Sequence, residues 1–145
     1  MSASVWKPVR ADLRRILLTT PGIPDTEWEA KRFRPAPGIA WIREKLNIAG
    51  ASTDTLGARG QTIERAIYAV DVMWPATGAL SDAEDLADAI RQTFWHGRGI
   101  GSSGPNPING SVIASSRQTT VEGDVWTEVP VRIEFFVRRY TRQAA

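Results

Sequence analysis

Residues 124–140, D-V-W-T-E-V-P-V-R-I-E-F-F-V-R-R-Y, carry the clearest structural signal in the chain. Their side chains alternate between two sets with a period of two residues, which is typical of a β-strand. One set is apolar: Val125, Thr127, Val129, Val131, Ile133, Phe135 and Val137. The other set is Trp126, Glu128, Pro130, Arg132, Glu134, Phe136 and Arg138. Since proline has no N–H for a ladder, Pro130 predicts a sheet edge or a bulge.

Three more segments are predicted strands. Residues 39–49 place Ile42, Leu46 and Ile48 on one face and Arg43, Lys45 and Asn47 on the other. Residues 62–74 place Tyr68, Val70, Val72 and Trp74 on one face and Ile63, Ile67 and Met73 on the other. Both faces of this second strand are therefore expected to be covered. Residues 112–121 form a weaker and more polar strand.

Two segments have helical periodicity. Residues 4–19 repeat Val9, Leu13, Ile16 and Leu17 at helical spacing, and Pro8 fits the first turn. The second helix has an apolar stripe of Ala83, Leu86, Ala87, Ile90 and Phe94. Ser81 followed by Glu84 predicts a capping box at its start, and Gly97 predicts its C-terminal cap.

The order of elements is helix, two strands, helix, two strands. Strands joined without a crossover helix pair antiparallel. The sequence therefore predicts an α+β fold, with a mostly antiparallel sheet of about four strands and two helices packed on one face. At 145 residues we expect a single domain over 1–145, with flexible loops at about 50–60 and 97–110.

The charge balance argues against a dedicated nucleic-acid binder. The chain has 18 Lys and Arg against 16 Asp and Glu, a net charge of +2, whereas such binders carry a strongly basic face. The charges are uneven, however: the first 45 residues and the C-terminus are basic, and residues 82–88 are acidic. Such patches suit a head-to-tail contact between copies, or are simply solvated surfaces.

The composition also limits the chemistry. The chain has no Cys, which excludes disulfides and thiolate zinc sites. No run approaches the roughly 20 apolar residues of a membrane span. The first residues, M-S-A-S-V-W-K-P, lack the apolar core of a secretory signal. We therefore expect synthesis in a reducing cytoplasm and no membrane partner.

An enzyme is not predicted. His96 is the only histidine, and it follows the second helix without a second catalytic partner. Asp82, Glu84, Asp85 and Asp88 do not match a calcium loop. The glycines of residues 97–101 follow a helix, whereas a dinucleotide loop follows a strand. No catalytic, cofactor-binding or metal-binding residue is predicted.

Candidate interface residues come from the charged segments, the loops and the aromatic side chains. Trp126 lies opposite the apolar face of the last strand, which makes it a candidate anchor for a neighbouring molecule. The charged candidates are Arg59, Arg98, Arg132, Asp82, Asp85 and Asp88.

Residues 28–43, W-E-A-K-R-F-R-P-A-P-G-I-A-W-I-R, resemble the signature of phage tail terminator (tail-completion) proteins, the lambda-type minor tail protein U group with its prophage and gene-transfer-agent relatives. The matching positions are Pro21-Gly22-Ile23-Pro24, Trp28-Glu29, Phe33, Pro35, Gly38, Trp41 and Arg43. Residues 68–72, Pro75, Gly78, the helix at 86–90 and residues 129–131 also match. Two features depart from the pattern: Ala66 replaces a frequent glycine, and the segment 97–110 is long.

The resemblance implies a structural virion protein. Its expected form is a ring, of six copies, that caps the tail tube, ends its polymerisation and offers a joining surface to the head-tail connector or stopper protein. Apart from the resemblance, the polar edge of the last strand suits addition to a neighbour's sheet. The expected location is the neck end of the virion tail, after assembly in the host bacterial cytoplasm. The alternative is another head-tail joining or neck connector subunit of the same general fold.

Overall fold

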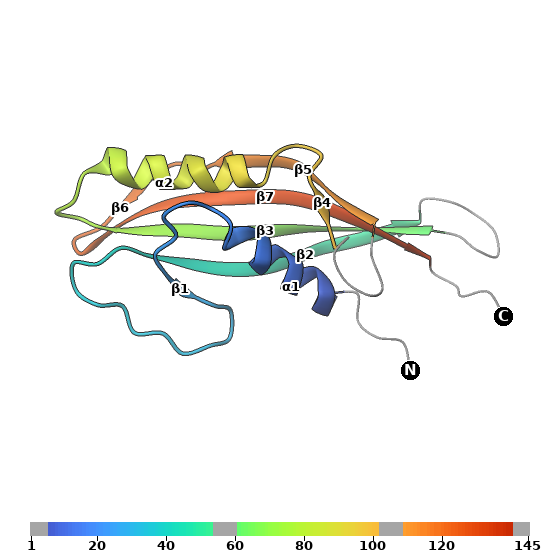
Figure 1. The fold of residues 1–145 in the computed structure, drawn as a ribbon, viewed down its shortest axis with the longest axis horizontal. Coiled ribbons are helices and arrows are strands. Elements are labelled where there is room, and N and C mark those ends of the chain that lie inside the picture. Colours follow the sequence, from blue (N-terminus) through green and yellow to red (C-terminus); the bar gives the residue numbers. More distant parts are fainter. Residues whose placement is uncertain (1–5, 54–60, 102–108, 141–145) are drawn as a thin grey trace.

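The computed structural model describes residues 6–53, 61–101 and 109–140. Within these residues two helices and seven strands follow one another (Figure 1). The helices are α1 (Trp6–Leu17) and α2 (Leu80–Thr93). The strands are β1 (Asp25–Glu27), β2 (Trp41–Thr53), β3 (Gln61–Pro75), β4 (Gly99–Ile100), β5 (Asn109–Arg117), β6 (Val121–Glu122) and β7 (Trp126–Tyr140).

The strands form one strongly curled sheet with the order β1-β2-β3-β7-β5-β4, and β6 pairs with β7 beside β5. All pairs are antiparallel except β1 with β2. The prediction of an α+β fold with a mostly antiparallel sheet is confirmed. The prediction of about four strands is wrong: the four long strands are β2, β3, β5 and β7, and three short ones add to them. Strands of two or three residues are too short to show a period in sequence.

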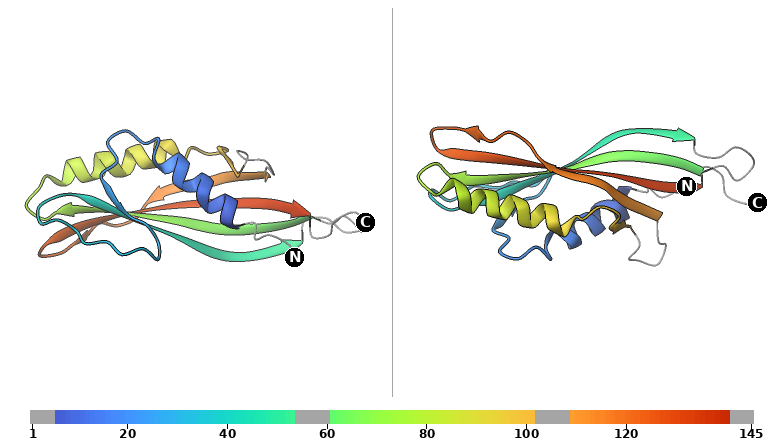
Figure 2. Two further views of the ribbon diagram at one scale, coloured as in Figure 1. Left: turned by 60° about the horizontal axis from the view of Figure 1, so that its bottom comes forward. Right: turned by 90° about the horizontal axis from the view of Figure 1, so that it is seen from above.

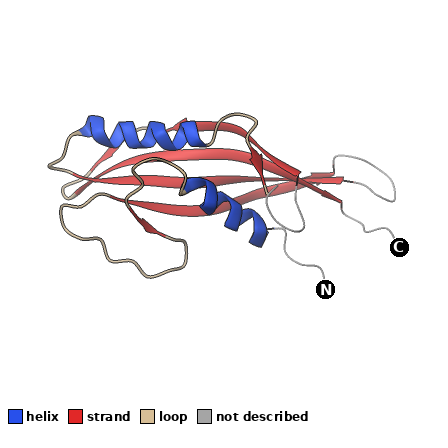
Figure 3. Cartoon of the chain, viewed as in Figure 1, coloured by secondary structure: helices blue, strands red, loops and turns tan. Residues whose placement is uncertain are grey.

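Both helices cover the same face of the sheet (Figures 2 and 3). The core lies between the helices and the sheet. It combines the apolar stripes of both helices with one side-chain set from each long strand. It includes Val9, Leu13, Ile16, Ile42, Tyr68, Val70, Val72, Leu86, Ile90, Phe94, Val129, Val131, Ile133, Phe135 and Val137. The alternating apolar residues identified in the sequence are therefore the residues that face the helices.

The opposite set of β3 is covered only in part. Ile63, Ile67 and Met73 are half-buried, while Ala69 and Asp71 on the same face are buried. Ile48 on β2 keeps its predicted face, since it pairs with Ala66 as Leu46 pairs with Tyr68, but its side chain is 54% exposed just before the register shift between Ile48 and Gly50.

β7 is a central strand, paired with β3 on one side and with β5 and β6 on the other. Its predicted pairing with a neighbour's sheet is therefore wrong, because both of its edges are occupied. The carbonyl of Pro130 accepts a hydrogen bond from the N–H of Gln118 at 2.9 Å, so the main chain of Pro130 faces the β5–β6 side. The missing proline N–H lies opposite residues 118–120, where that ladder is interrupted.

The ends of α2 differ from the prediction. The N-terminal cap is Ala79, and no side chain caps the helix, because the helix begins one residue before Ser81. Glu84 instead forms an ion pair with Arg117 on β5. The helix ends at Thr93 with Phe94 as its C-terminal cap, not at Gly97. The capping box was therefore wrong, while the predicted apolar stripe is buried.

The predicted loops overlap strands. β2 extends to Thr53, and β4 and the start of β5 occupy residues 99–100 and 109–110. The remainder of these loops, 54–60 and 102–108, lies outside the described residues.

Candidate functional site

Glu44 on β2 is a fully buried carboxylate that holds three parts of the molecule together. Its Oε2 accepts a 2.6 Å hydrogen bond from the hydroxyl of Tyr68 on β3. Its Oε1 accepts hydrogen bonds from the guanidinium of Arg14 at 2.8 Å and from the main-chain N–H of Glu29 at 2.7 Å. Burial, together with the adjacent Glu44 carboxylate, raises the pKa of Tyr68 far above its usual range. The phenol therefore stays protonated and donates to Glu44.

Trp28 and Glu29 attach the loop of residues 28–40 to this cluster. Arg14 lies over the ring of Trp28, 5.2 Å from its centroid. Glu29 accepts hydrogen bonds from the N–H of Leu46 at 3.0 Å and from Arg10. Burial on its own raises the pKa of Glu29, but these two donors outweigh it and hold the pKa below its ordinary value. The Trp-Glu pair thus fixes the base of the loop.

An aromatic row supports the same loop. Phe33 packs on Trp41, with ring centroids 5.1 Å apart, and Trp41 meets Trp126 edge to face at 6.0 Å. Trp126 is therefore half-buried against its own chain. The sequence placed it correctly on the face opposite the helices, but only the sheet register brings it to Trp41.

The open face of the sheet carries an ion-pair network centred on Asp71. Arg132 donates to its Oδ1 at 2.7 Å, and Arg43 donates to its Oδ2 at 3.1 Å. Arg43 also contacts Glu128 at 3.3 Å. These residues come from β2, β3 and β7, so the network joins three of the four long strands. Arg132, a predicted interface residue, is thus committed to a contact within the chain.

The acidic residues of α2 differ in their partners. Asp88 pairs with Arg91 at 3.3 Å, and Glu84 pairs with Arg117. Asp82 and Asp85 are exposed and form no ion pair within the described part of the chain. These two acids are therefore the members of the predicted acidic patch that are available to a neighbour.

Side chains from α2 and the segment after it cover the outer edge of β5. The guanidinium of Arg91 donates to the carbonyl of Ser115, and the ring of His96 lies against the carbonyl of Ile113. Arg98 stacks on Trp95 and donates to the carbonyl of Thr93 at 2.7 Å. This edge is therefore protected against strand addition. Of the remaining predicted interface residues, Arg59 lies outside the described residues.

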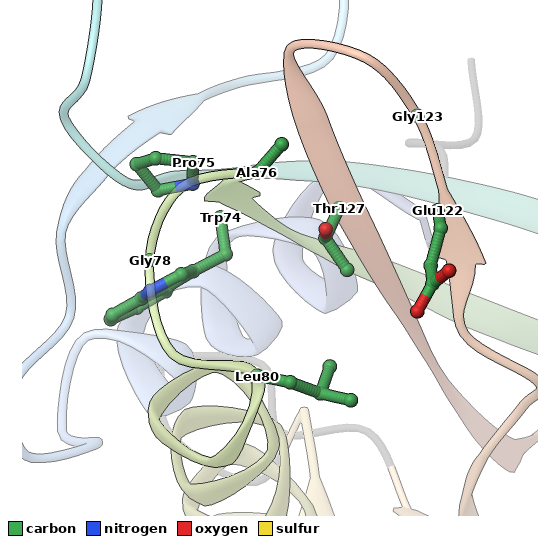
Figure 4. Close-up of a pocket in the computed structure, with 8 residues that line it drawn as sticks. All are labelled: Trp74, Pro75, Ala76, Gly78, Leu80, Glu122, Gly123 and Thr127. Atoms are coloured by element: carbon green, nitrogen blue, oxygen red, sulfur yellow. The ribbon is translucent and has the colours of Figure 1, made fainter.

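The described part of the surface has shallow cavities lined by polar, charged and apolar side chains. One cavity of about 270 Å³ lies between the start of α2 and the β6–β7 hairpin (Figure 4). Another, of about 650 Å³ beside β2, is lined by charges of both signs that include Glu27, Lys45 and Asp71.

Within residues 6–53, 61–101 and 109–140, no three acidic or histidine side chains gather where they could hold a metal ion. Neither described helix has the length and apolar character needed to cross a bilayer.

Sequence reasoning missed Glu44 and Asp71 as the centres of the two polar clusters. Glu44 stands between Ile42 and Leu46 on the face that the apolar residues predict to be buried. An acid at such a position is the available signal, since a buried carboxylate requires charged or hydrogen-bonding partners. Its partners Arg14 and Tyr68 are 30 and 24 residues away in the sequence.

The fold and its surface define a structural α+β domain built around a long curled sheet, with polar clusters that join its own elements. The family model of phage tail terminator proteins matches residues 4–135. The chain therefore belongs to the phage tail terminator family and is a structural, tail-terminating component of the virion, not an enzyme. The family implies an interaction with the tail tube. The resemblance drawn from residues 28–43 is confirmed.

Comparison with solved structures gives a similar fold. One solved chain superposes with a TM-score of 0.71 at 22% identity, covering 97% of this chain and 100% of that chain. A chain from a structure described as the virion of a native gene transfer agent particle has a TM-score of 0.48 and 15% identity, covering 94% of this chain and 92% of that one. No curated protein matches the sequence.

Proposed function

We propose that this chain forms a ring of six copies that caps the tail tube, ends its polymerisation and presents a joining surface to the head-tail connector or stopper protein. Family membership over residues 4–135 is the observation that carries the proposal. Residues 1–145 act in it as a single domain, made in the host bacterial cytoplasm and carried at the neck end of the tail.

The dimensions of the sheet support a ring subunit with partners at both ends. β3 and β7 are each 15 residues long, which corresponds to about 50 Å at about 3.3 Å per residue. Their continuous pairing and the Asp71 network stiffen this length. A stiff subunit of this kind can hold a tube-facing end and a head-facing end apart.

The distribution of protected edges supports side-by-side contacts through surface side chains. β7 is internal to the sheet, and the β5 edge is covered by Arg91 and His96. A ring built by continuing one sheet into the next would need a free edge at β5 or β4. Charged side chains and loops are therefore the favoured contacts between copies.

Electron microscopy of particles that lack this chain tests the proposal. We expect overlong tails of variable length and heads without tails, because nothing stops tube growth or joins the tube to the head. Restoring the full-length chain is expected to return tails to one length. Tails of normal length without attached heads would instead identify a neck connector and reject termination.

The ring itself is tested by native mass spectrometry of the chain and by imaging of the neck end of purified tails. Six copies per tail are expected. A single copy per tail, or an open chain of copies, would reject the ring while leaving the family assignment intact.

A further inference from the structure

A cationic loop and an acidic pocket lie at the same end of the sheet, on opposite flanks. The cationic loop is residues 31–39, the central part of the connection between β1 and β2. The acidic pocket is the cavity between the start of α2 and the β6–β7 hairpin (Figure 4). Both are at the end of the sheet where β2 and β7 begin (Figure 1).

The cationic loop carries positive charge without internal neutralisation. Lys31, Arg32 and Arg34 are exposed, and none of them forms an ion pair within the described residues. Ile39 in the same loop is 55% exposed. The base of the loop is held by Glu29, so these side chains project from a fixed support. A fixed support lowers the entropy that a contact costs.

The acidic pocket combines apolar side chains with one acidic side chain, Glu122. Trp74, Pro75 and Leu80 line it together with Glu122, and these side chains come from three segments of the chain (Figure 4). Leu80 is 41% exposed although it is aliphatic. Asp82 lies in the first turn of α2, close to Leu80 in the sequence, and is exposed.

The β6–β7 hairpin beside the pocket also exposes an aliphatic side chain next to an acidic one. Val125 is 66% exposed, and its carbonyl accepts a hydrogen bond from Ala76, which lines the pocket. Asp124 in the same turn is exposed and has no ion pair in the described part of the chain. The pocket and its surroundings therefore suit an aliphatic side chain flanked by cations.

The loop and the pocket of one molecule are kept apart by the sheet. β3 and β7 lie between β2 and β6. At about 4.8 Å per strand, β2 and β6 are about 14 Å apart, which exceeds the screening length of about 8 Å at physiological salt. None of the ion pairs of the described residues joins the loop to the pocket within one molecule, so their complementary charges are available to a contact between two copies that lie side by side.

We propose that the cationic loop of one copy docks against the acidic pocket of the next, with Ile39 against Leu80 and Arg32 and Arg34 beside Asp82 and Glu122. The contact joins two different surfaces, so it is head-to-tail, and repetition closes a ring. This inference rests on the proposed ring and names its contact. The occupant of the pocket is a second copy of this chain, because that copy supplies the matching aliphatic and cationic groups.

Cross-linking on assembled particles tests the contact directly. The chain has no Cys, so Ile39→Cys and Leu80→Cys introduce the only thiols of this protein. A short bismaleimide is expected to convert the double variant into covalent multimers up to the ring number. Each single variant is expected to give only unlinked chain. Absence of multimers from the double variant, on tails of normal length, would overturn the contact and leave tail termination standing.

Charge reversal tests it independently, with the amount of this chain on purified tails as the readout. Arg32→Glu with Arg34→Glu, or Asp82→Lys with Glu122→Lys, is expected to lower that amount about tenfold, because like charges then oppose each other. The four substitutions together are expected to restore it. Lys7→Glu with Arg65→Glu makes the same charge change as the loop pair at exposed positions elsewhere and is expected to have no effect.

The outcomes separate the contact from the ring. Circular dichroism of each purified variant establishes that it is folded. Loss that the fourfold variant fails to restore would assign the reversed surfaces to another partner and overturn the contact between copies. Normal-length tails in particles without the chain would instead reject the proposed function itself.

Discussion

The hydroxyl of Tyr68 donates a 2.6 Å hydrogen bond to Oε2 of Glu44, and both side chains are fully buried. This bond joins β2 to β3 beneath α1, where Arg14 and the N–H of Glu29 complete the environment of the carboxylate. A buried charge is tolerated only when its partners are all present. The Tyr68–Glu44 pair is thus the point at which helix, sheet and loop are held together.

Replacing Glu44 tests this role. Glu44→Gln keeps the shape of the side chain but removes the charged carboxylate to which Arg14 and Tyr68 donate hydrogen bonds. The free energy of unfolding is therefore expected to fall by about 2 kcal/mol. Tyr68→Phe is expected to cost about 1 kcal/mol, since it removes one donor. Urea unfolding measures both. The exposed neighbour Lys45 provides a control, and Lys45→Gln is expected to change stability by less than about 0.5 kcal/mol. Equal effects at 44 and 45 would contradict the assignment.

The pH dependence of stability is expected to show the contribution of Glu29. Its folded-state pKa is lowered, so its stabilisation is complete above the ordinary value of 4.5 and is lost as the pH falls through the lowered pKa. Glu29→Gln is therefore expected to be less stable than the wild type by about 1 kcal/mol at pH 7. The difference should narrow below pH 4.5. Urea titrations between pH 7 and pH 3 measure it, and a difference independent of pH would refute this role.

The open-face network is expected to depend on Asp71 more than on Glu128. Asp71 joins two guanidinium groups, at 2.7 Å and 3.1 Å, whereas Glu128 makes one contact at 3.3 Å. Asp71→Asn is expected to lower the free energy of unfolding by about 1–2 kcal/mol, and Glu128→Gln by less than about 0.5 kcal/mol. Chemical denaturation at low and high salt checks the order. A larger loss at position 128 would contradict it.

Gly110 lies where three strands meet, and a larger residue has no room there. A Cβ at this position would lie 2.7 Å from the carbonyl oxygen of Ile100 and 2.9 Å from that of Phe136. Because both are main-chain atoms, Gly110→Ala must displace β4 or β7. A loss of about 2–3 kcal/mol in the free energy of unfolding is expected. The neighbouring Ser111→Ala serves as a control, and thermal unfolding of both variants provides the comparison. Similar melting temperatures for Gly110→Ala and Ser111→Ala would contradict this prediction, because they would show that β4 or β7 can shift without a large loss of stability.

Local sequence patterns were sufficient for the long elements. Strand β7 and the apolar stripe of α2 follow from hydrophobic periods of two and 3.6 residues. Such periods can be recognised from residues that are close together in the sequence. The start of α2 was missed because Ser81 and Glu84 match a capping box, while the fold uses Glu84 to hold Arg117. The Trp28–Arg43 resemblance identified the family, although it did not explain why Trp28 and Glu29 are needed.

The sequence by itself determined the fold class, the buried apolar set of β7 and the apolar stripes of the two helices, and the absence of thiol chemistry. The tertiary structure alone decided the short strands β1, β4 and β6, the protected edge of β5, and the partners of Glu44 and Asp71. It also decided that the cationic loop and the acidic pocket flank the same end. The physical reason is that periodicity is a property of adjacent residues. Pairing of a charge or a strand edge depends instead on which distant residues the packed sheet brings within a few ångströms.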